Sequence, residues 1–429
     1  MKRLYFVFAA FLVASMVLAA CGTAATPTAS APATQAPATQ APATQAPATQ
    51  APAAAVPAVC STDAGGCAVF KPDQTIKIGM GAPMTGDNAA FGTDISQAGK
   101  LAVSDAGKFQ GFSFELDAQD DGGTGEGGAA VANKFVADPQ VVAIEGHIFS
   151  GATAAAIPIY EPKNIPMMSP SATNPTLTTT GSKVFNRNVF TDGKQGKFDA
   201  EYLYNTLKIT DLAVMHDGSA YGQGIAQVVN DSFKALGGNV VAFQAITPGE
   251  SDYSAVLADV ASKKPGAIYY GGYTAEAVIL VNEMKAAGLG SAIFFSDDGI
   301  YGQDFLDRTK ANGEGVYATS APLPPESPAK TTFDAAYLAA YGTAAGKLST
   351  YTWNAYDAAA VLIKDIESVA VLGGDGNLYI PRAALVAAVR ATKDYQGISG
   401  VITCDPTGEC SASNPILNEV KNGGWIVVP

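Results

Sequence analysis

The sequence predicts an α/β fold made of two lobes, each a doubly wound parallel sheet. From Ile76 onward, short β-rich runs alternate with segments whose apolar residues recur at helical spacing, which is typical of parallel sheets with crossover helices. About ten such runs are more than one twisted sheet usually holds, so we expect two lobes. The runs cover residues 76–83, 112–120, 141–149, 164–171, 183–190, 211–218, 239–247, 267–273, 292–299 and 315–322.

Helical patterns follow or separate these runs. The clearest of them cover residues 127–138, 196–208, 224–237 and 275–288. Three further helices are expected at 331–341, 352–369 and 381–392, and the tail from residue 398 to 429 is typical of a closing hairpin. This order places most helices between strands, as a doubly wound sheet requires.

The first twenty residues are typical of a secretory signal peptide. Lys2 and Arg3 precede an apolar run that is too short and too poorly flanked for a lasting transmembrane helix. The run ends in Leu-Ala-Ala-Cys, which resembles the bacterial lipobox, in which the cysteine is lipidated and becomes the first mature residue. We expect residues 1–20 to be removed and Cys21 to anchor the protein by lipid alone, in the periplasm or on the outer face of the cell membrane.

A tether follows the anchor. Residues 22–57 are almost entirely Ala, Pro, Thr and Gln, and the pentapeptide APATQ occurs four times between residues 31 and 50. Such a composition cannot bury a core, and regularly spaced prolines favour an extended chain. We expect residues 21–70 to be the lipid anchor and a disordered tether, with the globular part starting at about residue 71.

Net charge argues against two kinds of partner, and cysteine spacing indicates disulfides. The formal net charge of −13 argues against nucleic acid and against flat adsorption on anionic lipid, because both need a basic face. Four cysteines remain after Cys21, in two close pairs: Cys60 with Cys67, and Cys404 with Cys410. Outside the cytoplasm such pairs indicate local disulfides. A zinc site is the alternative, but it needs both pairs to meet across the fold.

Hydroxyl side chains follow two predicted strands where helices are expected to begin. Ser150 follows the run at 141–149, and Ser171 and Thr173 follow the strand of the run at 164–171. If these strands are parallel, both helix N-termini open on one edge of the sheet, where free N–H groups and the helix dipole favour a small carboxylate. Ordinary helix N-capping is the alternative for either cluster.

Aromatic and acidic side chains stand at other strand ends. Phe91 lies in the loop after the first strand, and Tyr221, Tyr273 and Asp298 follow strands of the expected second lobe. Ligands of doubly wound lobes bind beyond the carboxyl ends of the strands, so the cleft between the lobes is the natural site. Together with the hydroxyls, one acid for an ammonium group and aromatic rings for an apolar side chain match the needs of a zwitterionic amino acid.

Enzyme motifs are incomplete. Residues 123–128 read GTGEGG and match a dinucleotide-binding pattern, but the acids just before this loop would repel a pyrophosphate. The two histidines, His147 and His216, have no evident acid and nucleophile beside them, and His147 is best interpreted as a hydrogen-bonded structural residue. We expect no catalysis, no metal and no cofactor.

Four segments resemble the leucine/isoleucine/valine-binding proteins, the periplasmic solute receptors of branched-chain amino acid ABC transporters. They are GHIFSGATAAAIPIYEPKNIPMMSPSATNPTLT, HDGSAYGQG, ITPGESDYSAVL and AIYYGGYTAEAVILVNEMKAAGL, and the similarity runs in the same order from residue 75 to 428. The resemblance implies a type I periplasmic binding protein with three chain crossings at the hinge, near Thr191, Ser320 and Gly400. Lobe 1 would comprise 71–191 with 320–399, and lobe 2 would comprise 192–319 with 400–429.

The resemblance also implies a role for each candidate residue. Ser150 and Thr173 would hold the ligand carboxylate by hydroxyl and backbone N–H, and Ser171 would contact the ligand through its main chain. Tyr273 and Asp298 would contact the ammonium, while Tyr221 and Phe91 would close over the ligand.

Three features depart from the family pattern. Asp298 stands where the best-known leucine binders have Glu, so we expect a different preference for ligand size. The family's first-lobe disulfide is absent, because Gly123 and Phe149 occupy its positions, and Phe149 puts a bulky ring beside the carboxylate-binding loop. The cysteine pairs 60/67 and 404/410 are additions.

We therefore expect a monomeric, membrane-tethered receptor that captures a small amino acid, with leucine, isoleucine or valine as first candidates, and delivers it to an ABC permease. Two other functions of the same scaffold are alternatives: a sensory protein that signals to a membrane partner, and a binder of another small amide or amino acid derivative. A secreted enzyme that uses the loop at 123–128 is the alternative from a different class.

Overall fold

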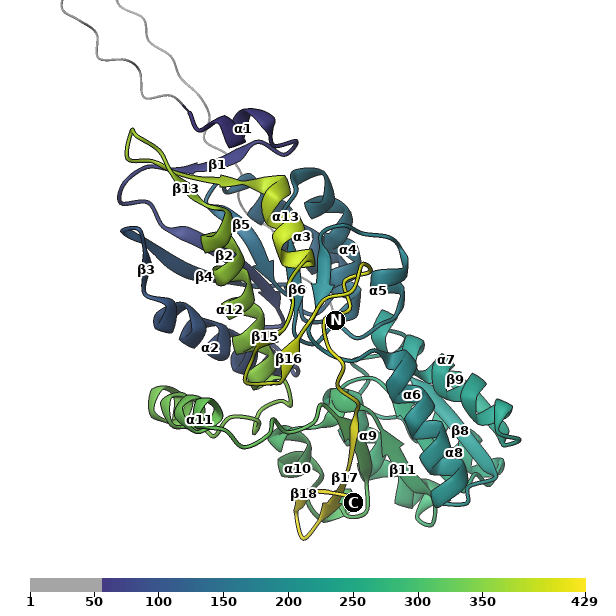
Figure 1. The fold of residues 1–429 in the computed structure, drawn as a ribbon. Helices are drawn as coiled ribbons and strands as arrows, with labels where there is room; N and C mark the ends of the chain where they lie inside the picture. The colour runs from purple at the N-terminus through teal and green to yellow at the C-terminus, as the bar shows by residue number, and fades with distance from the viewer. Residues whose placement is uncertain (1–55) are drawn as a thin grey trace, which may run out of the picture. The chain divides into compact units, whose positions relative to one another are not determined.

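The computed structural model describes residues 56–429, which belong to one compact unit (Figure 1). The expected signal peptide, Cys21 and the APATQ repeats lie outside the described residues, so what we expect of them stays a prediction. Within residues 56–429, no helix combines the length and the apolar character needed to cross a bilayer.

The first lobe is built on a six-stranded sheet in the order β3-β4-β2-β5-β6-β7. All neighbours are parallel except β3 and β4. Every residue of the central strand β5 is buried, as expected for a strand covered on both faces. The strands are β2 (Ile76–Ala82), β3 (Lys108–Phe109), β4 (Phe112–Asp120), β5 (Val141–Glu145), β6 (Met167–Ser169) and β7 (Phe185–Arg187).

Helices cover both faces of this sheet. On one face, α2 (Ala89–Ala106) packs against α12 (Thr352–Val369). Both helices belong to the core cluster that also contains residues of β2 and β4. The other pair, α3 (Gly125–Ala137) and α4 (Ser150–Tyr160), packs together in a separate core cluster (Figure 1). The remaining helices of this lobe are α1 (Ala58–Thr62), α5 (Thr176–Thr179), α11 (Pro328–Tyr341) and α13 (Arg382–Arg390).

The second lobe is built on a seven-stranded sheet in the order β18-β17-β12-β11-β10-β8-β9. Its strands from β8 to β12 are parallel, and a C-terminal hairpin adds two antiparallel strands at one side of the sheet, with β18 at the edge. The strands are β8 (Asp211–His216), β9 (Asn239–Ala245), β10 (Ala267–Gly271), β11 (Ile293–Ser296), β12 (Tyr317–Ser320), β17 (Ile416–Lys421) and β18 (Gly424–Val427). The helices are α6 (Asp192–Glu201), α7 (Ala220–Ala235), α8 (Ser254–Ser262), α9 (Thr274–Met284) and α10 (Gln303–Thr309).

Two parallel-sheet lobes joined by three chain crossings confirm the predicted fold class. The first two crossings follow β7 and β12, close to the predicted Thr191 and Ser320. The third lies later than the predicted Gly400, because the chain stays on the first lobe until residue 411. There, β16 (Val401–Ile402) pairs with β15 (Tyr395–Gln396), and Glu409 forms a bridge to Arg187 of β7.

Ordered structure begins before the expected boundary at residue 71. Strand β1 (Cys67–Phe70) pairs antiparallel with β14 (Leu378–Pro381), which also pairs with β13 (Val371–Leu372). The cysteine pairs 60/67 and 404/410 lie at disulfide-bonding distance, 2.03 and 2.02 Å between sulfurs. The first disulfide joins α1 to β1, so the end of the expected tether is fixed to the first lobe.

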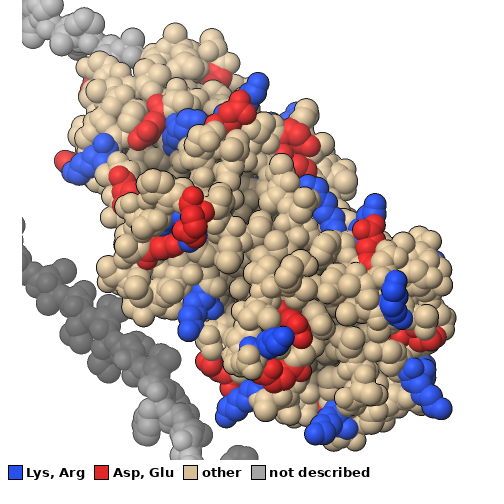
Figure 2. Space-filling model, turned by 60° about the horizontal axis from the view of Figure 1, so that its bottom comes forward, with Lys and Arg blue, Asp and Glu red and all other residues tan. Residues whose placement is uncertain are grey.

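Charged side chains of both signs are interspersed over the face shown in Figure 2. Basic residues do not form a continuous surface on that face. This distribution agrees with the argument from net charge against a nucleic-acid or anionic-lipid partner.

Candidate functional site

A cavity with an empty volume of about 250 Å³ lies between the two lobes. About 10 Å³ of it is free for a water molecule, which is about the space that one water needs, so the surrounding side chains nearly fill the site. Seven of the eight predicted site residues line it, and Thr173 does not. The lining residues are Phe91, Ile148, Phe149, Ser150, Ser171, Tyr221, Tyr273, Asp298, Gly299 and Tyr351.

The first lobe contributes the start of α4 and the loop that follows β6. Ser150 is the first residue of α4, so the free N–H groups of that helix end lie at the cavity. The Oγ atom of Ser150 accepts a hydrogen bond from the backbone N of Asn174 at 3.3 Å, and Ser171 Oγ donates to the carbonyl of Ile148 at 2.8 Å. These contacts join the two turns into one hydroxyl-rich wall.

One expectation for this wall is wrong. No helix begins at Ser171: residues 170–175 form a loop, and the short helix α5 starts only at Thr176. Prolines at 170 and 175 restrict the loop backbone and remove two donors. Among the described elements of this first-lobe wall, α4 alone therefore presents a helix N-terminus. The N-cap alternative for Ser150 is also excluded, because Phe149 holds the N-cap position.

Thr173 is fully buried in the same loop. Its Oγ1 atom makes no hydrogen bond of normal geometry among the described residues, but it lies close enough to the buried Asp192 carboxyl to lower the pKa of that acid. The carbonyl of Thr173 accepts a hydrogen bond from the backbone N of Asp192 at 3.0 Å, at the first hinge crossing. The loop thus keeps a buried hydroxyl that lies near Asp192 and does not line the cavity.

The second lobe contributes Asp298, which follows β11. Tyr221 donates to Asp298 Oδ1 at 2.9 Å, and Tyr351 of the first lobe donates to Oδ2 at 2.5 Å. Burial raises the pKa of Asp298 above its ordinary value, and hydrogen bonds from Tyr351 and Tyr221 oppose that rise. Sequence reasoning missed Tyr351, because nothing in its local sequence distinguishes it from a core tyrosine at the start of a helix.

Buried carboxyls surround Asp298. Burial, and then the nearby Asp298, raise the pKa of Asp297. Burial also raises the pKa of Asp192 to about 8 and the pKa of Asp199 well above its ordinary value. A cationic group beside Asp298 would relieve the repulsion among these acids.

Aromatic rings form the remaining wall. Phe149 of the first lobe stacks on Tyr273 of the second, with ring centroids 4.0 Å apart and planes 4° apart. Phe91, which lies in α2 and not in the predicted loop, meets Phe149 edge-on at 5.7 Å. Tyr221 lies 5.2 Å from Tyr273. Gly123 leaves room for the Phe149 ring, because a Cβ atom there would lie 2.6 Å from Phe149 Cδ2. Gly123 and Phe149 are thus packed against each other.

Backbone N–H groups of the loop at 123–128 are already engaged in local hydrogen bonds. Asp121 accepts from the N–H of Gly123 through Oδ1 and from the N–H of Thr124 through its carbonyl, and Thr124 caps α3 by accepting from Gly127 N at 3.0 Å. These are donors that a pyrophosphate would require. His147 lies fully buried between Asp121 Oδ2 at 2.7 Å and the Tyr160 hydroxyl at 2.9 Å and does not line the cavity.

Comparisons with known proteins agree with this architecture. The family model of periplasmic binding proteins matches residues 75–415. Leu/Ile/Val-binding protein homolog 2 from Brucella abortus (strain 2308) is 29% identical over 351 residues, 81% of this chain and 91% of that protein. Leu/Ile/Val-binding protein homolog 1 from Brucella suis biovar 1 (strain 1330) is 33% identical over 256 residues, 59% of this chain and 68% of that protein.

Two crystal structures have a similar fold. A leucine binding protein from Thermotoga maritima has a TM-score of 0.75 at 27% identity, over 83% of this chain and 98% of that chain. The branched-chain amino acid transporter substrate binding protein LivJ from Streptococcus pneumoniae, in complex with isoleucine, has a TM-score of 0.72 at 27% identity, over 83% and 99% of the two chains. The chain therefore belongs to the periplasmic binding protein family, among the branched-chain amino acid binding proteins, and is a substrate-binding protein rather than an enzyme.

Proposed function

We propose that the protein is an extracytoplasmic, lipid-anchored substrate-binding protein of an ABC transporter that binds a small amino acid and delivers it to the permease. One observation carries the proposal. A hydroxyl-rich helix N-terminus from one lobe and an acid from the other open into the same small cavity, with aromatic rings between them. The two poles of a zwitterion need this combination.

Each site residue has a role in the proposal. Ser150, Thr173 and the start of α4 bind the carboxylate, and Ser171 contributes its main chain. Asp298 binds the ammonium together with Tyr273. Phe91, Phe149 and Tyr221 enclose the side chain. In the closed form, burial of these charges strengthens both polar contacts, because the local dielectric constant is lower than in water.

Leucine, isoleucine and valine are the proposed ligands. The matched relatives are named as Leu/Ile/Val-binding homologues, and one matched structure holds isoleucine. The aromatic and apolar lining of the cavity suits a branched aliphatic side chain.

The test is a panel of amino acids and small amides measured by calorimetry and thermal unfolding. A true ligand at a hundred times its dissociation constant is expected to add about 2.7 kcal/mol to the free energy of unfolding. The variant Asp298→Asn is expected to lose binding of the best ligand by about a hundredfold or more, since it removes the buried countercharge of the ammonium. Asp307→Asn, which changes an exposed acid of the same lobe, is the matched control.

The proposal fails if no amino acid or amide changes the unfolding transition. Wild-type affinity in Asp298→Asn would show that the ammonium binds elsewhere. Loss of amino-acid uptake on deletion of the gene is expected for a transporter component. Normal uptake together with loss of a ligand response would favour a sensory protein on the same scaffold.

A further inference from the structure

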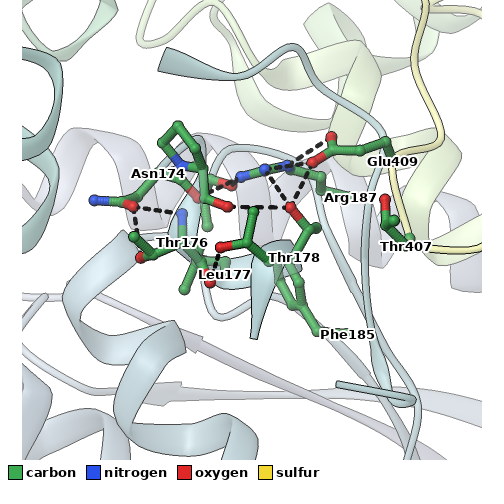
Figure 3. Close-up of polar contacts among 12 residues, drawn as sticks. Asn174, Thr176, Leu177, Thr178, Phe185, Arg187, Thr407 and Glu409 are labelled. Carbon is green, nitrogen blue, oxygen red and sulfur yellow. Dashed lines mark hydrogen bonds and ion pairs between the residues drawn. The ribbon is translucent and has the colours of Figure 1, made fainter. Parts of the chain in front are cut away.

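The guanidinium of Arg187 lies at the end of β7 and is fully buried. An arginine side chain has five N–H donors, and each of them is used here (Figure 3). Nε donates to Glu409 Oε2 at 2.9 Å, Nη2 donates to Glu409 Oε1 and Thr178 Oγ1 at 2.5 and 3.1 Å, and Nη1 donates to the carbonyls of Ala172 and Asn174 at 2.9 and 2.8 Å.

Nη1 of Arg187 fixes the loop that the ligand site uses. Its two acceptors, the carbonyls of Ala172 and Asn174, stand on either side of Thr173. The carbonyl between them accepts from Asp192 N at 3.0 Å. Three successive carbonyls are therefore held, and the backbone that carries the Thr173 hydroxyl has little freedom.

The same loop reaches the second lobe. Asn174 Nδ2 donates to the carbonyl of Ala220 at 2.6 Å, and Ala220 precedes Tyr221 of the cavity wall. Asn174 Oδ1 accepts from Thr176, which orients the amide. Fixing the carbonyl of Asn174 thus also fixes a contact between the lobes.

Glu409 holds Arg187 from the opposite side. It lies in the hairpin closed by the Cys404–Cys410 disulfide, and its side chain is 25% exposed. The hairpin also bonds to the backbone of Arg187: Arg187 N donates to Gly408 O and Cys410 N donates to Arg187 O, each at 2.9 Å. A buried guanidinium needs a compensating charge, and Glu409 supplies it in bidentate geometry.

We propose that Arg187 and Glu409 are positioning residues for the ligand site, an inference that rests on the function proposed above. Glu409 orients the guanidinium, the guanidinium holds the carbonyls of Ala172 and Asn174, and this sets Thr173 for the ligand and Asn174 for the second lobe. The hairpin of residues 404–410 therefore sets ligand affinity although it does not line the cavity.

The first experiment uses Glu409→Gln in the full chain, with Thr407→Ala as the matched control. Thr407 lies in the same hairpin, and its hydroxyl bonds only to Asp405. Glu409→Gln is expected to raise the dissociation constant of the best panel amino acid at least tenfold, at a temperature where both proteins are folded, and Thr407→Ala to change it less than twofold. A lower melting temperature with unchanged affinity in Glu409→Gln would show a purely structural role and overturn the proposal.

A ligand-free measurement separates this proposal from the proposed function. Amide hydrogen exchange of residues 171–174 in the unliganded protein is expected to become faster in Glu409→Gln and to stay unchanged in Thr407→Ala. Unchanged exchange in Glu409→Gln overturns the proposal, whatever the ligand is. If the wild-type protein binds no amino acid, the proposed function fails, and the exchange result still decides whether Glu409 orders the loop.

Glu409→Gln leaves a buried cation without its partner and can fail to fold. A second variant tests the proposal in that case. The double variant Arg187→Met with Glu409→Met removes both charges, a change that buried ion pairs often tolerate. It is expected to fold, with the same faster exchange at 171–174 and at least a tenfold loss of affinity. Wild-type exchange and affinity in the double variant would overturn the proposal.

Discussion

The hydroxyl of Tyr351 in the first lobe donates a hydrogen bond to Oδ2 of Asp298 in the second lobe, at 2.5 Å. Tyr221, from the same lobe as Asp298, donates to the other oxygen at 2.9 Å. The acid at the cavity is therefore held by one hydroxyl from each lobe. Closure of the lobes and burial of this acid are thus physically linked.

Tyr351→Phe is expected to weaken ligand binding by about tenfold to a hundredfold. A hydrogen bond to a charged group contributes about 1.5–3 kcal/mol, and this one forms only when the lobes meet. Calorimetry gives the affinity, and small-angle scattering gives the fraction of closed protein. Tyr341→Phe is the control, because the Tyr341 hydroxyl bonds within the first lobe, to the carbonyl of Gln97. Equal affinities in both variants would contradict the link.

Phe149→Leu is expected to change which amino acid binds best. The smaller side chain enlarges the cavity and removes the stack on Tyr273, an interaction that contributes about 0.5–1.5 kcal/mol beyond area burial. The affinity for phenylalanine relative to valine is expected to rise at least tenfold. Phe233→Leu, in the core of the second lobe, is the control for a general loss of packing. An unchanged ratio would show that Phe149 does not limit side-chain size.

The unliganded protein is expected to lose stability as the pH rises from about 6 to 8. Burial raises the pKa of Asp192 to about 8, so the folded state holds this proton more tightly than the unfolded chain does. The resulting stabilisation is complete below the unfolded pKa and is lost as the pH rises through the folded pKa. One such group changes the free energy of unfolding by up to about 1.4 kcal/mol per pH unit.

Urea unfolding at several pH values measures this dependence. Asp94 and Asp357, whose pKa values burial raises to about 6, add to the slope at lower pH. Asp192→Asn is expected to reduce the slope from about pH 4, the unfolded pKa of an aspartate, up to pH 8, and to leave the contributions of Asp94 and Asp357 below pH 6. A wild-type curve that rises between pH 6 and 8 would show that these acids are ionised in the folded protein.

Cys21→Ser is expected to release the protein from the membrane fraction without changing its ligand affinity. The prediction follows from the lipobox-like sequence before Cys21 and from a binding site that lies wholly within the described residues. Fractionation and mass spectrometry of the mature N-terminus measure the outcome. Continued membrane association of Cys21→Ser would place the anchor elsewhere.

Local patterns in the sequence were sufficient for the fold class. Alternating strand and helix patterns predict parallel sheets. Each of these patterns depends on residues that are close in the chain, so the sequence alone reveals it. The same reasoning placed Ser150, Tyr221 and Asp298 at one cavity, since ligands of doubly wound lobes bind beyond the carboxyl ends of the strands and the natural site is the cleft between the two lobes. The short spacing of the cysteines likewise predicted both disulfides correctly.

The tertiary structure decided what depends on distant segments. Tyr351 reaches Asp298, and Glu409 reaches Arg187 across 222 residues of sequence, because the chain returns to the first lobe after each crossing. Two local expectations also failed: the loop at 170–175 is not a helix, and the third crossing lies after residue 411 rather than at Gly400. In both places, hydrogen bonds to the side chain or the backbone of Arg187 fix the chain. The sequence therefore determined the sheets and the residues at the strand ends, whereas packing between distant segments decided how the site is held.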